Sequence, residues 1–315
     1  MADVQTVATR VGYGEALVAL GNDRDDFIVM DADLAAATQT GKFKAAFPER
    51  FYDCGIAEQN MMGIAAGIAA TGKKVIVSSF AMFAAGRAFE QIRNSICYPK
   101  LPVIIGATHA GISVGEDGAT HQCNEDIALM RTLPGMTIIN PADAVEAKKA
   151  LYAAMEIDSP VYLRFGRYAV PVIFDDDYKF EIGRANILRE GGDVTVIATG
   201  LMVNEALIAH DILKSEGISA RVINMATIKP LDTSAVLAAA RETGAIVTAE
   251  EHSVIGGLGS AVSEAVCEAC PVPVIKLGVY DRFGYSGPAG KLLDEFGLRA
   301  ANIAEKAKAA IALKK

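Results

Sequence analysis

The sequence predicts a two-domain α/β protein, in which each domain is a mainly parallel sheet covered by helices. Short β-branched, apolar runs alternate with helical patterns over almost the whole chain, and one polar connector interrupts the alternation. With 315 residues, the chain is long enough for two hydrophobic cores. We place the boundary after residue 188, which gives a first domain of residues 1–188 and a second domain of residues 189–315.

The first domain contains five predicted strands with helices between them. Nearly continuous apolar runs indicate strands that are buried on both faces of a sheet. Between them, residues 81–96 and 142–156 have helical patterns. The five strands are residues 27–32, 74–80, 101–108, 136–141 and 161–165.

The connector carries Pro171, the acidic triplet Asp175–Asp177 and the pair Gly191–Gly192. Such residues are typical of a surface segment between domains. Beyond the connector, the stretch Val203–Ser215 places apolar side chains at helical spacing. Four strands are predicted in the second domain, at residues 194–199, 220–225, 245–250 and 272–278.

The composition argues against several classes of function. The formal net charge is −8, and no basic stripe occurs, so neither nucleic acid nor an anionic membrane is a favoured partner. No apolar run reaches the length of a bilayer span. The first residues lack the basic and apolar regions of a secretory signal, so we expect a cytoplasmic protein.

The five cysteines are scattered, and their odd number predicts no disulfide framework. Cys267 and Cys270 have the C-x-x-C spacing of a redox or zinc pair. A structural role is favoured for both, because no second pair accompanies them and they end a helical pattern.

Glu58 comes shortly before a stretch, residues 61–70, that contains no polar side chain. A carboxylate in front of a segment suited to burial has two explanations. It is either a solvated residue at a helix start, where its charge complements the helix dipole, or a buried group that must be paired or protonated. The flanking residues do not decide between the two.

The loop of residues 108–126 directly follows a predicted strand, so it leaves the carboxyl edge of the sheet, where open α/β sheets bind ligands. Between His109 and His121 it carries Glu116, Asp117 and three glycines. These acid and imidazole side chains can hydrogen-bond a substrate and transfer protons. The alternative is a polar surface turn. The two histidines, far apart on an irregular loop, do not form a metal-ligand signature.

Two further stretches allow a structural interpretation. Phe80 and Phe83 stand three positions apart at a strand-to-helix turn, and aromatic residues at such a spacing usually belong to the core. Gly256, Gly257 and Gly259 lack the spacing of a phosphate-binding G-x-G-x-x-G motif, so close packing at a helix start is favoured.

Several stretches, taken together and in their order, resemble the C-terminal half of transketolases. The resemblance covers nearly the whole chain, and GIAEQN and GEDGATHQ at their mutual spacing are its most specific motifs. Deoxyxylulose-phosphate synthases and the β chains of ketoacid dehydrogenases share part of the pattern, but His109 and the spacing around GEDGATHQ are more similar to transketolase. The matching stretches are DADL, GIAEQNMMGIAAGIA, SFAMF, GEDGATHQ, LPGMTIINPAD and YLRFGR.

The resemblance implies thiamine diphosphate as the cofactor. In the family, the residue that matches Glu58 hydrogen-bonds N1′ of the cofactor's aminopyrimidine and promotes loss of the proton from the thiazolium carbon. The cofactor then supplies the carbanion chemistry, and the protein orients it. By the same resemblance, Phe80 and Phe83 form an aromatic wall against the pyrimidine ring, and Asp33 contributes to the pocket.

The implied reaction is transfer of a two-carbon ketol unit from a ketose phosphate to an aldose phosphate, as in the pentose phosphate pathway. His109 and His121 match the catalytic histidines that lie near the hydroxyls and the carbonyl oxygen of the donor sugar. Asp117 matches the acid that reads the configuration of the substrate's hydroxyl group.

Arg10 and Arg167 resemble the arginines that hold the sugar phosphate in this family, a role that suits a planar guanidinium. Arg164 is the nearby competitor of Arg167 for that role. The family's phosphate-binding serine falls near Ala37, so this contact is either missing or replaced by Thr38.

The GDG…N element, which in the family holds the diphosphate and its divalent metal, does not occur in the sequence. The chain therefore resembles one subunit of a split transketolase, whose N-terminal partner subunit holds the diphosphate and Mg²⁺ or Ca²⁺. The small residues after Glu58 would let that helix pack against its own copy, so we expect a homodimer within an α2β2 assembly. The alternatives are a deoxyxylulose-phosphate-synthase-like or ketoacid-dehydrogenase β-type subunit, and a non-catalytic subunit that only binds its partner.

Overall fold

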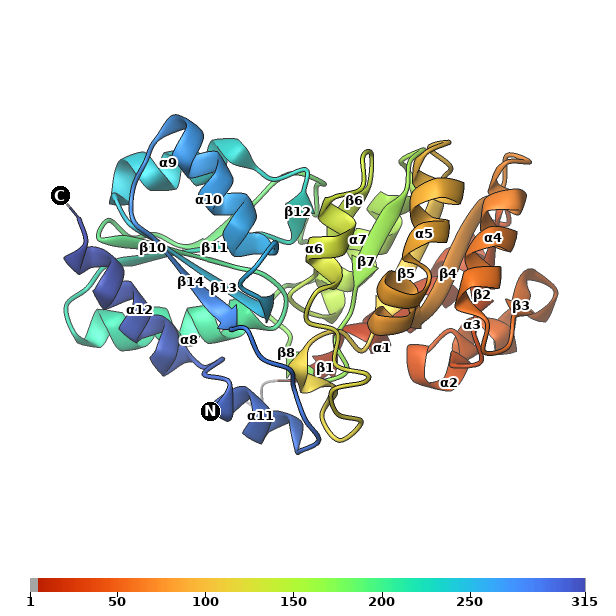
Figure 1. Ribbon diagram of the computed structural model, residues 1–315, viewed down its shortest axis with the longest axis horizontal. Coiled ribbons are helices and arrows are strands. Elements are labelled where there is room, and N and C mark those ends of the chain that lie inside the picture. Colours follow the sequence, from red (N-terminus) through yellow and green to blue (C-terminus); the bar gives the residue numbers. More distant parts are fainter. Residues whose placement is uncertain (1–4, 315) are drawn as a thin grey trace.

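The computed structural model describes residues 5–314, which form two lobes that each contain a sheet between helical layers (Figure 1). The first lobe holds a seven-stranded sheet in the order β12-β6-β7-β5-β4-β2-β3. Strands β2 to β7 all pair in parallel, as predicted from their apolar runs. They are β2 (Phe27–Asp31), β3 (Phe51–Asp53), β4 (Lys74–Phe80), β5 (Val103–Thr108), β6 (Thr137–Ile139) and β7 (Val161–Arg164).

Helices cover both faces of this sheet. One core lies between the sheet and α4, α6 and the turns around α5, and the other lies between the sheet and α1, α3 and α7. The helices are α1 (Thr9–Asp23), α2 (Ala35–Thr38), α3 (Gly41–Ala46), α4 (Glu58–Ala69), α5 (Phe89–Gln91), α6 (Asp126–Arg131) and α7 (Ala144–Met155). Shorter turns are η1 (Pro48–Arg50), η2 (Met82–Arg87), η3 (Ile92–Cys97) and η4 (Ile112–Val114).

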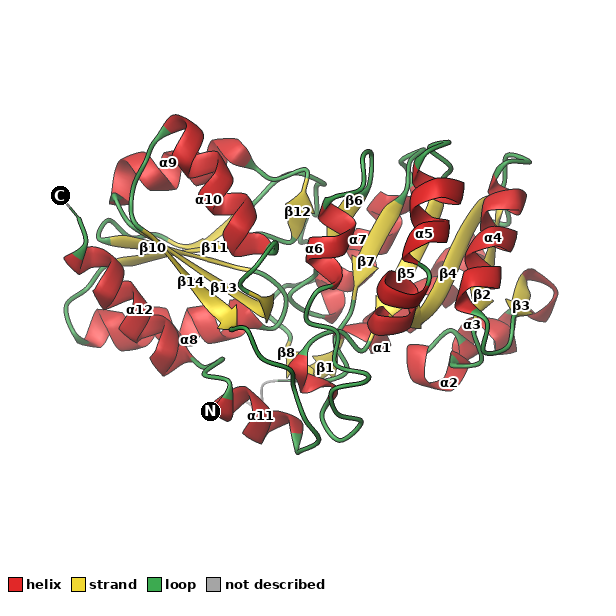
Figure 2. Cartoon of the chain, in the orientation of Figure 1, coloured by secondary structure: helices red, strands yellow, loops and turns green. Residues whose placement is uncertain are grey.

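The second lobe holds a five-stranded sheet in the order β14-β13-β10-β11-β9. Helices α8 and α12 pack on one face and α9 and α10 on the other (Figure 2). The strands are β9 (Asn186–Arg189), β10 (Val194–Ala198), β11 (Ala220–Asn224), β13 (Ile246–Ser253) and β14 (Val274–Val279). The helices are α8 (Met202–Ser215), α9 (Thr233–Thr243), α10 (Leu258–Ala269), α11 (Ala289–Glu295) and α12 (Ala300–Ala312).

Some short strands pair with strands that are distant in the sequence, and these pairings were not predicted. Strand β12 (Thr227–Lys229) leaves the second half and pairs antiparallel with β6 of the first sheet. Strands β1 (Thr6–Ala8) and β8 (Ala169–Pro171) form a small separate sheet. Strand β9 pairs with β11, so the boundary placed after residue 188 falls inside a strand of the second sheet.

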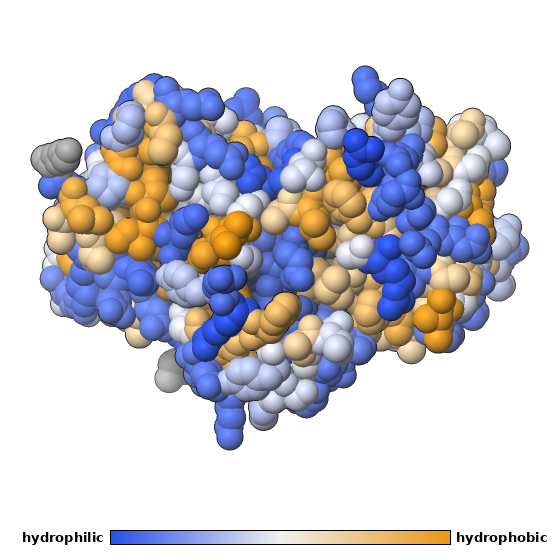
Figure 3. All heavy atoms as spheres, in the orientation of Figure 1, coloured by the Kyte–Doolittle hydropathy of each residue, from blue (hydrophilic) through white to orange (hydrophobic). Residues whose placement is uncertain are grey.

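Polar and apolar side chains alternate over the face of the molecule seen in Figure 3. The most exposed large apolar side chains include Ile56, Tyr98 and Phe283, with exposed fractions of 78%, 87% and 86%. Across residues 5–314, no helix combines the length and the apolar character that crossing a membrane requires. All five cysteines are free thiols.

Candidate active site

The carboxyl edge of the first sheet brings together residues that are distant in the sequence. Strand β4 lies between β2 and β5 and ends at Phe80, and His109 directly follows β5. Asp33 follows β2 at the same edge, and α4 begins at Glu58. Because parallel strands end at a common edge, the topology places these residues near one another.

Glu58 is buried, with an exposed fraction of 1%. The Arg87 guanidinium donates to its Oε2 at 2.7 Å, and the Ser79 hydroxyl donates to its Oε1 at 3.3 Å. The interpretation as a solvated residue at a helix start is therefore wrong. A buried charge requires a partner, and Arg87 is that partner here.

Four rings lie against each other beside this carboxylate. Phe80 and Phe83 stack with centroids 5.9 Å apart and planes 15° apart. The ring of His109 stacks on Phe80 at 3.8 Å, and His121 meets Phe83 edge-on at 5.2 Å. The two phenylalanines thus form an aromatic wall in contact with two imidazoles. Packing of a hydrophobic core alone would not require imidazoles at these positions.

His109 is a buried imidazole in a left-handed backbone conformation, with φ of 56°. For a residue with a side chain this conformation costs about 1–2 kcal/mol, so the surrounding structure must hold it in place. Burial lowers the pKa of His109 to about 3, and the nearby charges of Arg10, Arg167 and His121 contribute to the same shift. The ring is therefore neutral at physiological pH.

Arg10 and Arg167 both lie near this histidine. Arg10 Nη1 donates to the carbonyl of Ala37 at 2.5 Å, and Arg167 donates to Glu116 at 3.0 Å and to the carbonyl of Val114. Burial lowers the pKa of Arg10, and the like charge of Arg167 adds to that shift. Two cations held close together provide a favourable environment for an anionic ligand.

Arg164, the competitor of Arg167, is buried and is bonded through two of its nitrogens, Nε and Nη2. Its Nε donates to Asp126 at 2.8 Å, and its Nη2 donates to the carbonyls of Glu251 at 3.0 Å and Cys123 at 3.4 Å. Tyr162 donates to the same carboxylate oxygen at 2.9 Å. Arg164 is therefore part of the interior and unsuited to holding a sugar phosphate.

Thr38 is likewise unavailable to replace the serine of the family. It is fully buried, and its hydroxyl donates to Asp31 Oδ2 at 2.7 Å. Thr40 donates to the same oxygen at 2.9 Å, and the Leu34 amide donates to Oδ1 at 2.6 Å. Burial nevertheless raises the pKa of Asp31 to about 6.

Asp33 and Asp117 are exposed on turns with left-handed backbone. Asp33 itself has φ of 63°, and its amide donates to Asp53 at 3.1 Å. Asp117 lies between Gly115 and Gly118, which have φ of 85° and 75°. A Cβ on Gly118 would lie 2.5 Å from the Ser286 hydroxyl oxygen, so the turn needs glycine there. Both aspartates are therefore accessible to solvent.

The second lobe holds the loop that carries His109 and His121. The Ser113 amide donates to Glu251 Oε1 at 2.5 Å, and the Gln122 side chain donates to the carbonyl of Tyr285 at 3.0 Å. These contacts come from residues more than a hundred positions away, so no local sequence signal could have identified them.

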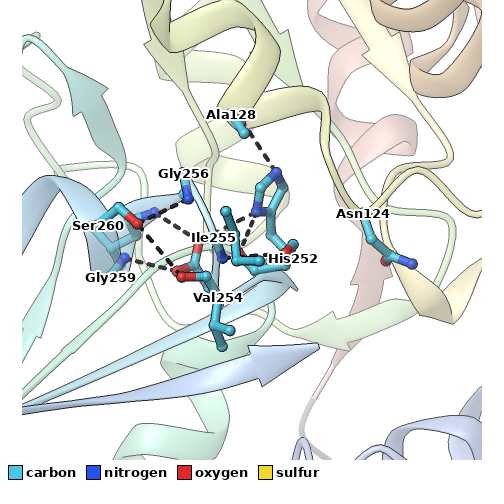
Figure 4. Close-up of polar contacts among 12 residues, drawn as sticks. Asn124, Ala128, His252, Val254, Ile255, Gly256, Gly259 and Ser260 are labelled. Carbon is cyan, nitrogen blue, oxygen red and sulfur yellow. Dashed lines mark hydrogen bonds and ion pairs between the residues drawn. The ribbon is translucent and has the colours of Figure 1, made fainter. Parts of the chain in front are cut away.

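His252 fixes the start of α6, just beyond that loop. The Ala128 amide donates to its Nε2 at 3.3 Å, and its Nδ1 donates to the carbonyl of Ser253 at 2.8 Å (Figure 4). Both ring nitrogens are used, which fixes the neutral tautomer with its proton on Nδ1. Burial lowers the pKa of His252 to about 4. The structural role expected for His252 agrees with this geometry.

A cleft of about 810 Å³ between the lobes opens beside Phe83 and Arg87. Its opposite wall includes Asn124, Glu125 and the segment Tyr280–Phe283 of the second lobe. The sequence did not point to Arg87 or to this segment as parts of the site. The position of Arg87, four residues after Phe83 on a helical pattern, was the only available signal.

A buried carboxylate beside an aromatic wall fits an aminopyrimidine ring, which offers nitrogen atoms to the carboxylate and a flat face to the wall. The GDG…N element, which in the family holds the diphosphate, does not occur in the sequence. Within residues 5–314, no three His, Cys, Asp or Glu side chains are grouped so that they could hold a metal ion. The fold and the site thus define a class, the pyrimidine-binding section of thiamine-diphosphate-dependent enzymes.

Comparison with known proteins identifies the family. Residues 5–172 match the family model of the transketolase pyrimidine binding domain, and residues 183–303 match that of the transketolase C-terminal domain. The chain belongs to the transketolase family and corresponds to its C-terminal section. These domains imply dependence on thiamine diphosphate.

Relatives of similar length share this organisation. The chain is 49% identical to a protein named as a transketolase C-terminal section of Methanocaldococcus jannaschii, over 94% of each sequence. It is 43% identical to a 6-deoxy-6-sulfo-D-fructose transketolase subunit of Clostridium sp. strain MSTE9, over 94% of this chain and 92% of the relative.

Two solved structures match 99% of this chain. A split-gene transketolase, described as an inactive β4 tetramer, superposes with a TM-score of 0.91 at 51% identity and covers 99% of this chain and 100% of its own. A transketolase of Pichia stipitis in complex with sedoheptulose 7-phosphate has a TM-score of 0.83 at 26% identity, and only 46% of that chain is covered.

Proposed function

We propose that this chain is the C-terminal subunit of a split transketolase, which transfers a two-carbon ketol unit from a ketose phosphate to an aldose phosphate. One observation carries the proposal. Glu58 is buried beside the wall of Phe80 and Phe83, in a chain that lacks the GDG…N element. The missing half of the site must come from an N-terminal partner subunit, which would hold the diphosphate and Mg²⁺ or Ca²⁺.

The residues of this chain would bind and orient the pyrimidine half of the cofactor. When bound, thiamine diphosphate supplies the nucleophilic carbon and the electron sink of the reaction. Glu58 would hold a proton at N1′, and Phe80 and Phe83 would fix the ring plane and exclude water. The burial of Glu58 supports this role, because a water-filled site would weaken its hydrogen bond.

His109, His121 and Asp117 would bind the sugar. His109 is neutral at physiological pH, so it can donate to the carbonyl oxygen or hydroxyls of the donor without adding charge. His121 sits at the edge of the same aromatic wall. Asp117 is exposed on its glycine turn, where it can accept from a sugar hydroxyl. Arg10 and Arg167 would hold the anionic end of the sugar.

The anionic end of the sugar could be a phosphate or another oxyanion. No hydroxyl is available at Ala37, and the Thr38 hydroxyl is used by Asp31, so two guanidinium groups would bind the anion without a serine. Guanidinium groups accept phosphate and other oxyanions. The Clostridium relative is named for a sulfonated sugar. A sulfonated donor is therefore a second candidate substrate, to be tested beside the phosphorylated one.

The exposed face of α4 supports the proposed α2β2 assembly. A Cβ on Gly63 or on Gly67 would meet nothing within 4 Å, and Ile64, between them, is 40% exposed. A second helix could approach this face closely. Sedimentation of the mixed subunits should show one species larger than either chain alone, whereas only separate species at micromolar concentration would contradict the assembly.

Reconstitution with the partner subunit tests the function. We expect ketol transfer from xylulose 5-phosphate to ribose 5-phosphate by the mixture and none by either chain alone. Release of carbon dioxide from pyruvate would instead indicate a deoxyxylulose-phosphate-synthase-like or dehydrogenase-type subunit. Stable assembly with no turnover of any donor would indicate a non-catalytic, partner-binding subunit.

A further inference from the structure

Arg87 connects the two groups that a pyrimidine ring would use. Its Nη1 donates to Glu58 Oε2 at 2.7 Å, and its guanidinium carbon lies 4.7 Å from the centroid of Phe83. Both contacts are possible because residues 83 and 87 lie four positions apart on the helical turn η2 and therefore share one face. One side chain therefore covers the carboxylate and contacts the aromatic wall.

This arrangement conflicts with the role proposed for Glu58. The charge-assisted hydrogen bond from Arg87 occupies the Oε2 oxygen of Glu58, which the pyrimidine nitrogen would need. To hold a proton at N1′, Glu58 must be released from that bond.

We propose that Arg87 is a positioning residue that holds Glu58 while the pyrimidine site is empty and gives up the carboxylate when the cofactor binds. The inference rests on the proposed function, because it requires the pyrimidine ring to reach Glu58. In the chain alone, Arg87 keeps a buried charge neutralised and the carboxylate in place. Cofactor binding then exchanges one partner of Glu58 for another.

The structure allows Arg87 to leave but not Glu58. The Arg87 side chain is 47% exposed, whereas that of Glu58 is 1% exposed. Arg87 lines the 810 Å³ cleft, which gives the long side chain space to move. Glu125 and Asp281 line the same cleft, so it offers carboxylates to the released guanidinium.

Charge balance gives the exchange a second signature. When Arg87 withdraws, its positive charge no longer compensates Glu58. The buried site is then left with one positive charge fewer, and a proton taken up from solvent can compensate for that loss. Cofactor binding should therefore be linked to proton uptake, and part of that uptake should depend on Arg87.

The test measures binding of thiamine diphosphate with Mg²⁺ to the reconstituted two-subunit complex by calorimetry. Removing Arg87 abolishes the competition for Glu58, so R87Q should bind the cofactor about tenfold more tightly than the wild type, a difference of about 1.4 kcal/mol. R87K should tighten binding less, because an ammonium pairs with a carboxylate less well than the guanidinium fork. R93Q is the matched control and should bind like the wild type. Arg93 is exposed, and among the described residues its side chain bonds only the adjacent Asn94.

Proton uptake is measured in the same experiment, in two buffers with different ionisation enthalpies. A mutation that only disturbs the structure would not change it in a defined direction. R87Q should take up fewer protons per cofactor than the wild type, by up to about one, because cofactor binding then displaces no guanidinium.

Weaker binding by R87Q and R87K would overturn the inference and assign Arg87 to holding the cofactor or the substrate. Proton uptake unchanged by R87Q would also overturn the inference, because no exchange of partners would then accompany binding. If R87Q is recovered unfolded, R87K decides alone by the direction of its change in affinity. Failure of the wild-type complex to bind thiamine diphosphate would overturn the proposed function instead. The two failures are therefore distinguishable.

Discussion

Two arginine–carboxylate pairs in this protein differ in one respect that separates structure from function. In the pair of Asp126 and Arg164, inside the first lobe, both side chains are buried, with exposed fractions of 0% and 3%. In the pair of Glu58 and Arg87, at the sheet edge, only the carboxylate is buried, and the arginine is 47% exposed. The first pair can be changed only by unfolding the region, whereas the second can exchange one partner for a ligand.

The same contrast separates the two buried histidines. His252 uses both ring nitrogens for backbone groups of its own chain. Among the described residues, His109 bonds only the adjacent Thr108 hydroxyl, through Nδ1, at 2.9 Å, and its ring face lies on Phe80. Burial lowers the pKa of both rings, so a shifted pKa alone does not mark the functional one. The two rings differ instead in how many of their nitrogens have a hydrogen-bond partner among the described residues, and we use this difference to separate them.

The largest effect on activity is expected at the pair of Glu58 and Arg87. E58Q should lower kcat/KM for ketol transfer by about 10³-fold in the reconstituted complex, because proton transfer at N1′ is lost. Assembly, measured by sedimentation, should not change. E90Q, at an exposed glutamate of the same lobe, serves as the control. Near-full activity of E58Q would remove Glu58 from the proton relay.

A substitution in the pair of Asp126 and Arg164 should change the stability of the fold instead. R164M leaves Asp126 buried without its cation, so the free energy of unfolding should fall by about 3–5 kcal/mol. Urea denaturation of the chain alone measures this. A loss below about 1 kcal/mol would show that the fold of this region does not depend on the pair.

His109 should affect activity and leave the fold unchanged. H109N removes an imidazole expected to touch the donor sugar, so kcat/KM should fall by about 10²-fold. The midpoint of urea unfolding should stay close to that of the wild type, because only the Thr108 bond and the ring stacking are lost. A large loss of stability with normal kinetics would place His109 with His252 among the structural residues.

His252 should show the opposite behaviour, and its effect should depend on pH. H252N should cost about 1–3 kcal/mol of stability at pH 7.5, because buried backbone groups lose their partners. The folded pKa of His252, about 4, lies below its ordinary value of 6.5, so its contribution is complete above pH 6.5 and is lost as pH falls through 4. The stability difference between wild type and H252N should therefore shrink on acidification.

Comparing the two proteins at each pH removes the contribution of titrating groups that do not contact position 252; Glu250, whose Oε2 lies 3.7 Å from His252 Nδ1, is the nearby group that does. Burial raises the pKa of Glu250 and of Glu251 to about 7, and both variants contain these groups. A stability difference that grows as pH falls from 6.5 to 4 would contradict the assignment of a neutral His252.

The smallest effect is expected at Thr38. T38V removes one of two hydroxyl bonds to Asp31 Oδ2 and should cost about 1 kcal/mol of stability. The KM for the sugar phosphate should stay within about twofold of the wild type, because the hydroxyl faces Asp31. A tenfold rise in KM would mean that Thr38 replaces the missing serine.

The sequence predicted what depends on local patterns. All nine predicted strands are present, because each is an apolar run bounded by turn residues. His109, Phe80 and Glu58 were found because each lies directly at an element's end. Arg87 was not found as the partner of Glu58, since their pairing joins positions 29 residues apart on two elements. Nor did the sequence separate Arg164 from Arg167. Arg164 belongs to β7 and is buried, whereas Arg167 follows the strand and is partly exposed. The spacing of the two residues in the sequence does not reveal this difference in burial.

Calorimetry of thiamine diphosphate binding tests most directly the claim that this chain holds only half of a cofactor site. The titration is run with Mg²⁺, on this chain alone and on its mixture with the partner subunit that carries the diphosphate domain. We expect tight binding in the mixture and none to the chain alone. Tight binding to the chain alone would contradict the claim, since the diphosphate and metal would then be held by residues of this chain.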